Sequence, residues 1–108
     1  MSTERTVIDN LWIEKTPEGY KVGLTNQAQD DLGSISFVTL PKVGQRLTKG
    51  DAFVELEAEK SVSEFSSPLT GTIVHINEGA DKDPAVLDDV EESNAWLAIF
   101  SDVNEDFR

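Results

Sequence analysis

Residues 54–65 read VELEAEKSVSEF, and apolar and polar residues alternate on both sides of Lys60. Alternation with a period of two is typical of strands that bury one face. We therefore predict a hairpin whose two turn residues are Glu59 and Lys60. In this register the residues expected on the inner side pair as Val54 with Phe65, Leu56 with Ser63 and Ala58 with Ser61.

The same register predicts where the side chain of Lys60 lies. The opposite face of the hairpin then carries Glu55, Glu57, Val62 and Glu64. The ammonium group of Lys60 is expected in solvent beyond the end of the sheet, with no bulky neighbour to cover it. An exposed lysine at the tip of a hairpin indicates an attachment point for a covalent group.

Length and charge restrict the class of protein. A chain of 108 residues predicts a single domain over residues 1–108, and a domain of this size buries roughly two thirds of the surface of its unfolded chain. The formal net charge of −12 disfavours nucleic acids and anionic membranes as partners. It favours brief association with basic protein surfaces, although acidity that serves only solubility explains the same number.

The absence of cysteine and of recognisable targeting segments restricts the chemistry and the expected location of the protein. The chain has no Cys, which excludes disulfides and thiolate chemistry. The first ten residues lack the apolar segment of an export signal, and no apolar run approaches the roughly 20 residues of a membrane span. We therefore expect a cytoplasmic protein, although a presequence removed earlier would leave no trace.

The rest of the chain is predicted to be mainly β, with two short helices. Asn26 is expected to cap the first helix, with Gln29 reaching back to it, and Gly33 to end it. The second helix is expected from Pro84, preceded by Asp83, to Leu87. Further strands are predicted at 11–15, 20–24, 34–40, 72–76 and 96–100, and the acidic residues after 100 are expected to fray.

A faint internal symmetry surrounds the hairpin. Residues 43–50 lead into the strand before Lys60, and residues 67–71 lead away from the strand after it, with glycines at matching turns. Two half-units of this kind predict a flattened β-barrel, or sandwich, of two small sheets.

Glycines, prolines and spacings across about residues 10–100 match one known pattern. The matching residues are Gly19-Tyr-Lys-Val-Gly-Leu-Thr25, Ala28-Gln29, Leu32-Gly-Ser-Ile-Ser-Phe-Val-Thr-Leu-Pro-Lys-Val-Gly44, Lys49-Gly50-Asp51, Glu57-Ala-Glu-Lys60, Ser67-Pro68, Gly71 and Trp96-Leu97. In these residues the chain resembles the glycine cleavage system H protein family. The resemblance implies the lipoyl-domain fold, a barrel-sandwich hybrid, with lipoate in amide linkage to Lys60. It also implies a supporting turn made of Glu57, Ala58, Glu59 and Ser61.

The resemblance further implies a carrier and not an enzyme. Family members present the lipoyl group as a swinging arm to a pyridoxal-phosphate decarboxylase, a folate-dependent transferase and a flavin dehydrogenase in turn. The implied partners are therefore a lipoylating ligase or transferase, and then glycine cleavage enzymes or other lipoyl-dependent enzymes.

Some positions depart from the family pattern. Asn10-Leu11-Trp12 stands where a His-Glu-Trp start is usual, Ala58 replaces a serine, residues 88–94 lack a Gly-rich loop, and only residues 101–108 follow the last strand. With these departures the chain resembles a short, H-like branch of the same family. That branch implies a role in lipoyl transfer, or in a redox response linked to ADP-ribosylation, with a sirtuin-type enzyme as a partner.

Two other functions fit an exposed turn lysine. A biotinyl carrier normally places its lysine between two methionines, whereas Lys60 lies between Glu59 and Ser61 and the only methionine is Met1. An unmodified acidic adaptor protein would use Lys60 as an ordinary solvated residue.

Catalytic and metal-binding residues are sparse. The only histidine, His75, is expected to be a half-buried strand residue and not a general base. The pairs of acidic residues lack the spacing of a calcium loop, so no metal site is predicted. The remaining aromatic residues considered, Trp12, Trp96, Phe37 and Phe53, are expected in the core.

Overall fold

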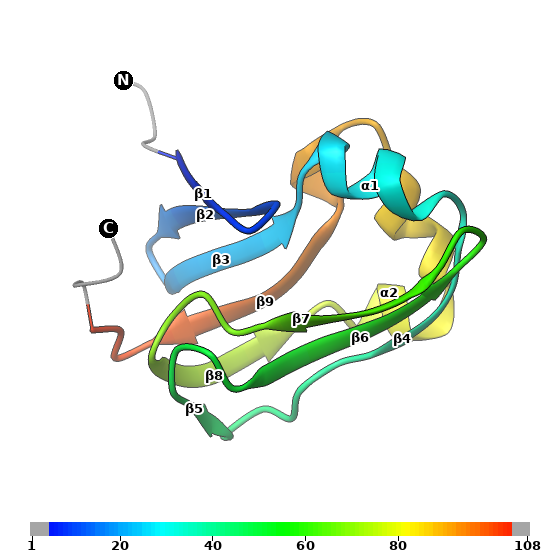
Figure 1. Ribbon diagram of the computed structural model, residues 1–108. Helices are drawn as coiled ribbons and strands as arrows, with labels where there is room; N and C mark the ends of the chain where they lie inside the picture. Colours follow the sequence, from blue (N-terminus) through cyan, green and yellow to red (C-terminus); the bar gives the residue numbers. More distant parts are fainter. Residues whose placement is uncertain (1–4, 105–108) are drawn as a thin grey trace.

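The computed structural model describes residues 5–104 and shows two β-sheets with short helical segments at one end (Figure 1). One sheet has six strands in the order β1-β2-β3-β9-β8-β5, and the other has three in the order β4-β6-β7. The elements are β1 (Arg5–Ile8), β2 (Leu11–Thr16), β3 (Gly19–Leu24), α1 (Asn26–Leu32), β4 (Ile35–Thr39), β5 (Arg46–Leu47), β6 (Ala52–Ala58), β7 (Val62–Ser66), β8 (Gly71–Ile76), α2 (Glu78–Lys82), the 3-10 helices η1 (Pro84–Asp88) and η2 (Glu92–Asn94), and β9 (Trp96–Ser101). The predicted fold class, mainly β with two small sheets, is confirmed.

The hairpin around Lys60 has the predicted register. Val54 pairs with Phe65 and Leu56 with Ser63 between β6 and β7. The amide of Ala58 donates to the carbonyl of Ser61 at 3.0 Å, which closes the hairpin with Glu59 and Lys60 as its turn. The alternation of residue types was sufficient to predict this register because a slip by one residue would exchange the two faces.

The six-stranded sheet contains the other predicted strands and two more. β2 and β3 form the expected hairpin, with Leu11 opposite Leu24 and Thr16 opposite Gly19. β1 and β5 were not predicted, because four and two residues are too few to show a period. β5 pairs with β8, and the amide of Gly50 donates to the carbonyl of Ser67 at 2.9 Å. The two segments that flank the lysine hairpin in sequence therefore lie side by side.

The helix α1 begins one residue earlier than predicted. Thr25 is the N-cap, because its Oγ1 accepts a hydrogen bond from the amide of Ala28 at 3.1 Å and itself donates to the carbonyl of Asn10 at 3.0 Å. Asn26 is instead the first helical residue, and its side-chain amide donates to Oε1 of Gln29 at 2.8 Å. The prediction of Asn26 as the N-cap was wrong because the position of Thr25 depends on its hydrogen bond to Asn10, which is distant in the sequence.

The second predicted helix is η1, a 3-10 helix. Its N-cap is Asp83, whose carboxylate accepts from the amide of Ala85 at 3.3 Å, and Pro84 is at the first turn as expected. The preceding α2 and the following η2 were not predicted, because five and three residues are too short to show helical periodicity. Together α2, η1 and η2 form the connection between β8 and β9.

Trp12 and Phe53 are both buried, as predicted. Phe53 belongs to the main apolar cluster between the two sheets, whereas Trp12 is buried outside that cluster. Trp96 is only half-buried, and the prediction for Phe37 is wrong because its side chain is 53% exposed. The register of β4 against β6 shifts between Ile35 and Phe37. This bulge turns Phe37 away from the core, while Ile35 and Val38 stay buried. Among residues 5–104, no helix has the length and apolar character that crossing a bilayer requires.

Candidate functional site

The backbone of the Lys60 turn is fixed to the connection between α1 and β4. The amide of Lys60 donates to the carbonyl of Leu32 at 3.0 Å, and the amide of Glu59 donates to the carbonyl of Ser34 at 2.8 Å. Both residues of the turn, which lies beyond the end of its own strands, are thus hydrogen-bonded to the same neighbouring segment. The backbone is held in place, while the side chain of Lys60 is exposed.

Gly33 allows the turn to lie this close. A Cβ atom at Gly33 would lie 3.0 Å from Oε1 of Glu59 and 3.3 Å from Cγ of Lys60. Its φ angle of +77° is also one that glycine adopts far more readily than other residues. The sequence predicts Gly33 only as the end of α1, and its contact with the lysine turn has no local sequence signal.

The ammonium group of Lys60 has a neighbour that the sequence did not predict. Nζ donates a hydrogen bond to the carbonyl oxygen of Asp30 at 2.8 Å, in the last turn of α1. Carbonyl groups of the last turn of a helix lack partners inside the helix and carry a partial negative charge. The side chain is exposed, as expected, and the hydrogen bond to Asp30 is an additional contact that the sequence did not predict.

The four supporting residues surround Lys60 in different environments. Ala58 is half-buried at the end of β6, and Glu57 lies on the exposed face opposite Val62. Glu59 is exposed and packs against Gly33. The hydroxyl of Ser61 shares a hydrogen bond of 3.2 Å with the hydroxyl of Ser63.

A shallow hollow of about 310 Å³ lies beside the turn, and its lining includes Lys60, Gly33 and Asp88. Asp88 was not singled out from the sequence as a site residue. Its carboxylate accepts from the amide of Ile35, at 3.2 Å to Oδ1 and 3.3 Å to Oδ2. Partial burial raises the pKa of Asp88, and the hydrogen bond from Ile35 opposes this effect. The hollow thus places a partly desolvated carboxylate close to the lysine turn and to the start of β4.

We expect Asp88→Asn to raise the urea midpoint of the chain at pH 7. A carboxyl group whose pKa is raised on folding contributes stability below its unfolded pKa, and this stability is lost as pH rises through the folded pKa. At pH 7 the ionised carboxylate of Asp88 therefore lowers the free energy of unfolding. The asparagine keeps an oxygen acceptor for Ile35 without the charge. The gain should shrink as pH falls toward 3.8, the ordinary pKa of the group.

Urea unfolding of both chains at several pH values measures this difference. A lower midpoint for Asp88→Asn at pH 7 would show that the negative charge itself stabilises the fold, for example through Lys60 in the same hollow.

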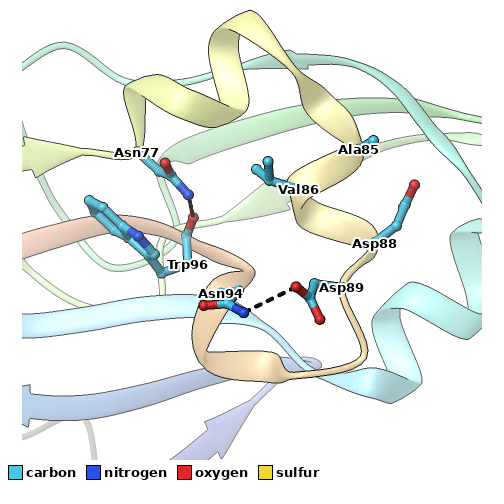
Figure 2. A pocket seen from close by; sticks show the side chains of 7 residues that line it. All are labelled: Asn77, Ala85, Val86, Asp88, Asp89, Asn94 and Trp96. Carbon is cyan, nitrogen blue, oxygen red and sulfur yellow. Dashed lines mark hydrogen bonds between the residues drawn. The ribbon is translucent and has the colours of Figure 1, made fainter.

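A second hollow of about 470 Å³ lies between η1, η2 and the start of β9 (Figure 2). Its carboxamides are used within the fold: Asn77 donates to the carbonyl of Trp96 at 2.9 Å, and Asn94 donates to Oδ2 of Asp89 at 3.0 Å. The amide of Glu91 and the side chain of Asn94 lower the pKa of Asp89 by hydrogen bonding. These contacts hold the connection between β8 and β9 in place. Asp88, whose pKa is raised by burial, also lines this hollow, so it lies between the hollow and the lysine turn.

The other candidates from the sequence lie away from the lysine turn. The side chain of His75 is 53% exposed, so it is not the half-buried residue expected, and its Nε2 is 3.9 Å from Oε2 of Glu18. Within residues 5–104, no group of three or more histidine, aspartate and glutamate side chains is arranged to hold a metal ion.

Two small sheets with a lysine at the tip of one hairpin define the lipoyl-domain class of fold, the barrel-sandwich hybrid. A family model described as glycine cleavage H-protein matches residues 4–106. The chain belongs to the glycine cleavage H-protein family.

Individual relatives agree with this assignment. The chain is 37% identical over 97 residues to the glycine cleavage system H protein of Listeria monocytogenes serovar 1/2a, covering 90% of this chain and 78% of that protein. It is 38% identical over 91 residues to the H protein of Bacillus pumilus, covering 84% and 72% of the two chains. A crystal structure of a glycine cleavage system H protein from Mycobacterium marinum superposes with a TM-score of 0.81 at 33% identity, covering 97% of this chain and 90% of that one. The resemblance inferred from the sequence is confirmed.

Proposed function

We propose that this chain is a non-catalytic carrier with lipoate in amide linkage to Lys60. The observation that supports this most is the contrast between the held backbone of the turn and the exposed side chain of Lys60. A carried group must start from a defined point and still reach separate active sites. A lysine on a fixed turn meets both requirements, and membership of the H-protein family makes lipoate the expected group.

The residues around Lys60 fit an acylated arm. Acylation removes one positive charge, which takes the formal balance of the chain from −12 to −13. The resulting amide keeps one N–H, which can still donate to the carbonyl of Asp30 that now accepts from Nζ. When bound, lipoate supplies a disulfide that accepts a carbon group or electrons from an enzyme. The chain itself holds and presents this group.

Biotin fits the turn less well. Glu59 and Ser61 flank Lys60, and the methionine pair of biotinyl domains is missing. An unmodified adaptor protein would not need the backbone hydrogen bonds that fix the turn to Leu32 and Ser34. The intact mass of the chain after expression with a lipoylating enzyme, and separately with a biotin ligase, distinguishes the three functions.

Glycine cleavage enzymes are the partners that family membership favours, together with a lipoylating ligase or transferase. We expect the lipoylated chain, supplied as the only carrier, to support NADH formation from glycine in a reconstituted glycine cleavage assay. The chain with Lys60→Arg should give no NADH.

An H-like role in lipoyl transfer, or in a redox response linked to ADP-ribosylation, is the second candidate. It is favoured by Leu11, which is buried and apolar at the position where the family pattern has a glutamate. A fully lipoylated chain that gives no NADH in the reconstituted assay would support this second role. A sirtuin-type partner would then be tested by ADP-ribosylation of the lipoylated and unmodified chains.

A further inference from the structure

The outer face of the three-stranded sheet exposes two large apolar side chains next to the lysine turn. Phe37 on β4 is 53% exposed and Val62 on β7 is 65% exposed. Both lie in one row across the sheet, because Phe37 pairs with Glu57 and Glu57 pairs with Val62. Glu57 is three residues from Lys60, which is about 10 Å along a strand. Two exposed apolar groups therefore lie on the face of the sheet about 10 Å from the turn.

The next row of the same face places two like charges directly opposite each other. Glu55 pairs with Glu64 across β6 and β7, and Thr39 completes the row on β4. Like charges opposite each other across a sheet reduce its stability. The strands β4, β6 and β7 contain no lysine or arginine, and none of the ion pairs among residues 5–104 involves Glu55 or Glu64. The fold itself supplies no counter-charge for this pair.

A mainly apolar groove of about 450 Å³ continues this face beyond β4. Phe37 and Thr39 line it together with the apolar residues Leu40, Val43 and Ile76, and one basic and one acidic residue, Lys42 and Asp81, also lie in its lining. Val43 is itself 59% exposed. Because Phe37 and Thr39 belong to both the groove and the sheet face, the two form one surface. We define the Phe37 surface as Phe37, Thr39, Glu55, Val62 and Glu64 with the adjoining groove.

An apolar centre with unpaired charges beside it is the composition of a protein interface. We propose that the Phe37 surface is the docking site of the enzyme that acylates Lys60. The partner would present basic side chains to Glu55 and Glu64, and an apolar side chain to the groove beside Phe37.

The choice of the acylating enzyme as the partner rests on the proposed function and on the position of the atom with which each enzyme reacts. Enzymes that use a finished lipoyl arm react with its dithiolane ring, which is at the end of the arm far from Nζ. The acylating enzyme instead acts on the Nζ atom of the unmodified lysine, so it has to contact the surface next to the turn. It is also the one enzyme that every lipoyl carrier requires. The net charge of −12 steers a basic enzyme toward the chain as a whole, and the Phe37 surface then determines where the enzyme binds.

Initial rates of acylation test the proposal. The unmodified full chain is incubated with a lipoate–protein ligase, lipoate and ATP, and the increase in intact mass is followed at low and at moderate salt. The lipoate carboxylate first reacts with ATP to form an acyl-adenylate and pyrophosphate. The lysine amine then attacks the acyl carbon, which forms the amide and releases AMP and a proton. The variants are Phe37→Ala and the double substitution Glu55→Gln with Glu64→Gln. Matched controls on the other sheet are Val7→Ala, which removes an exposed apolar side chain, and Glu18→Gln.

Phe37→Ala is expected to lower kcat/KM by roughly tenfold, mainly through KM, as for a central interface residue. The glutamine pair should lower kcat/KM at low salt and weaken its salt dependence. Its thermal midpoint should be unchanged or higher, because a like-charge contact has been removed. The controls should react like the wild-type chain.

Wild-type rates in both variants, equal losses in the controls, or a loss of rate that only follows a loss of thermal stability would each overturn the proposal. If Phe37→Ala fails to fold, the acylation rates of the Glu55→Gln, Glu64→Gln double variant alone test the proposal: a wild-type rate with wild-type salt dependence overturns it. A wild-type chain that is not acylated at all would overturn the proposed function instead, and the docking site with it.

Discussion

A chain with Lys60→Arg is expected to show no lipoyl increment in its intact mass after expression with a lipoylating enzyme, while the wild-type chain shows one. The guanidinium group keeps the positive charge and can donate to the carbonyl of Asp30 in place of Nζ. The substitution therefore preserves the turn. Arginine stays protonated at all relevant pH values and does not react as an amine nucleophile, so acylation at this position should be lost completely.

Lys49→Arg is the matched control for this substitution. Lys49 is also an exposed lysine in a turn, but it lies before β6 and not at the tip of the hairpin. Its chain should be lipoylated like wild type, and both variants should melt at the wild-type temperature. A lipoyl increment that persists in Lys60→Arg would show that another amine bears the group.

Trp12→Ala is expected to lower the free energy of unfolding by about 3–5 kcal/mol, as for other large buried aromatic residues. Trp12 is fully buried, and its Nε1 donates to the carbonyl of Leu24 at 3.0 Å. The guanidinium of Arg5 lies 4.6 Å from the centre of the ring on the outer side. A Cβ atom on Gly23 would lie 2.3 Å from the ring, so the chain packs tightly here and cannot fill the space that alanine would leave.

Urea unfolding measures this loss, and Trp96→Ala is the comparison. Trp96 is half-buried, and the Nζ atom of Lys21 lies 5.3 Å from the centre of its ring. Trp96→Ala should therefore lower the free energy of unfolding by clearly less than Trp12→Ala does. Equal losses of unfolding free energy for the two substitutions would contradict the view that the greater burial of Trp12 makes it the more important of the two tryptophans for stability.

The central hairpin could be predicted from the sequence because its information is local. Alternation from Val54 to Phe65 determines both the register and the face of every residue. The glycines and prolines of the turns have the same local character. Together they predict two small sheets and a lysine at the tip of a hairpin.

The short elements β1, β5, α2 and η2 have too few residues to show a period, and several other features that the sequence did not predict depend on contacts between distant parts of the chain. The bulge in β4 exposes Phe37, and it depends on how β4 pairs with β6 and not on the residues of β4 alone. The N-cap at Thr25 depends on Asn10, and the partner of the Lys60 ammonium group is the carbonyl of Asp30. Asp88 reaches the site because η1 packs beside the start of β4. None of these long-range contacts produces a periodic pattern of residue types, so none could be predicted from a single sequence.

The hydrogen bonds from Glu59 and Lys60 to Ser34 and Leu32 have a consequence for any group attached to the lysine. They make the origin of the arm part of the rigid body of the domain. The attached group then samples a volume centred on one fixed point, with a radius set by the arm and not by movement of the hairpin. For an enzyme bound to the same domain, the effective concentration of that group is determined by the distance from the fixed point to the active site.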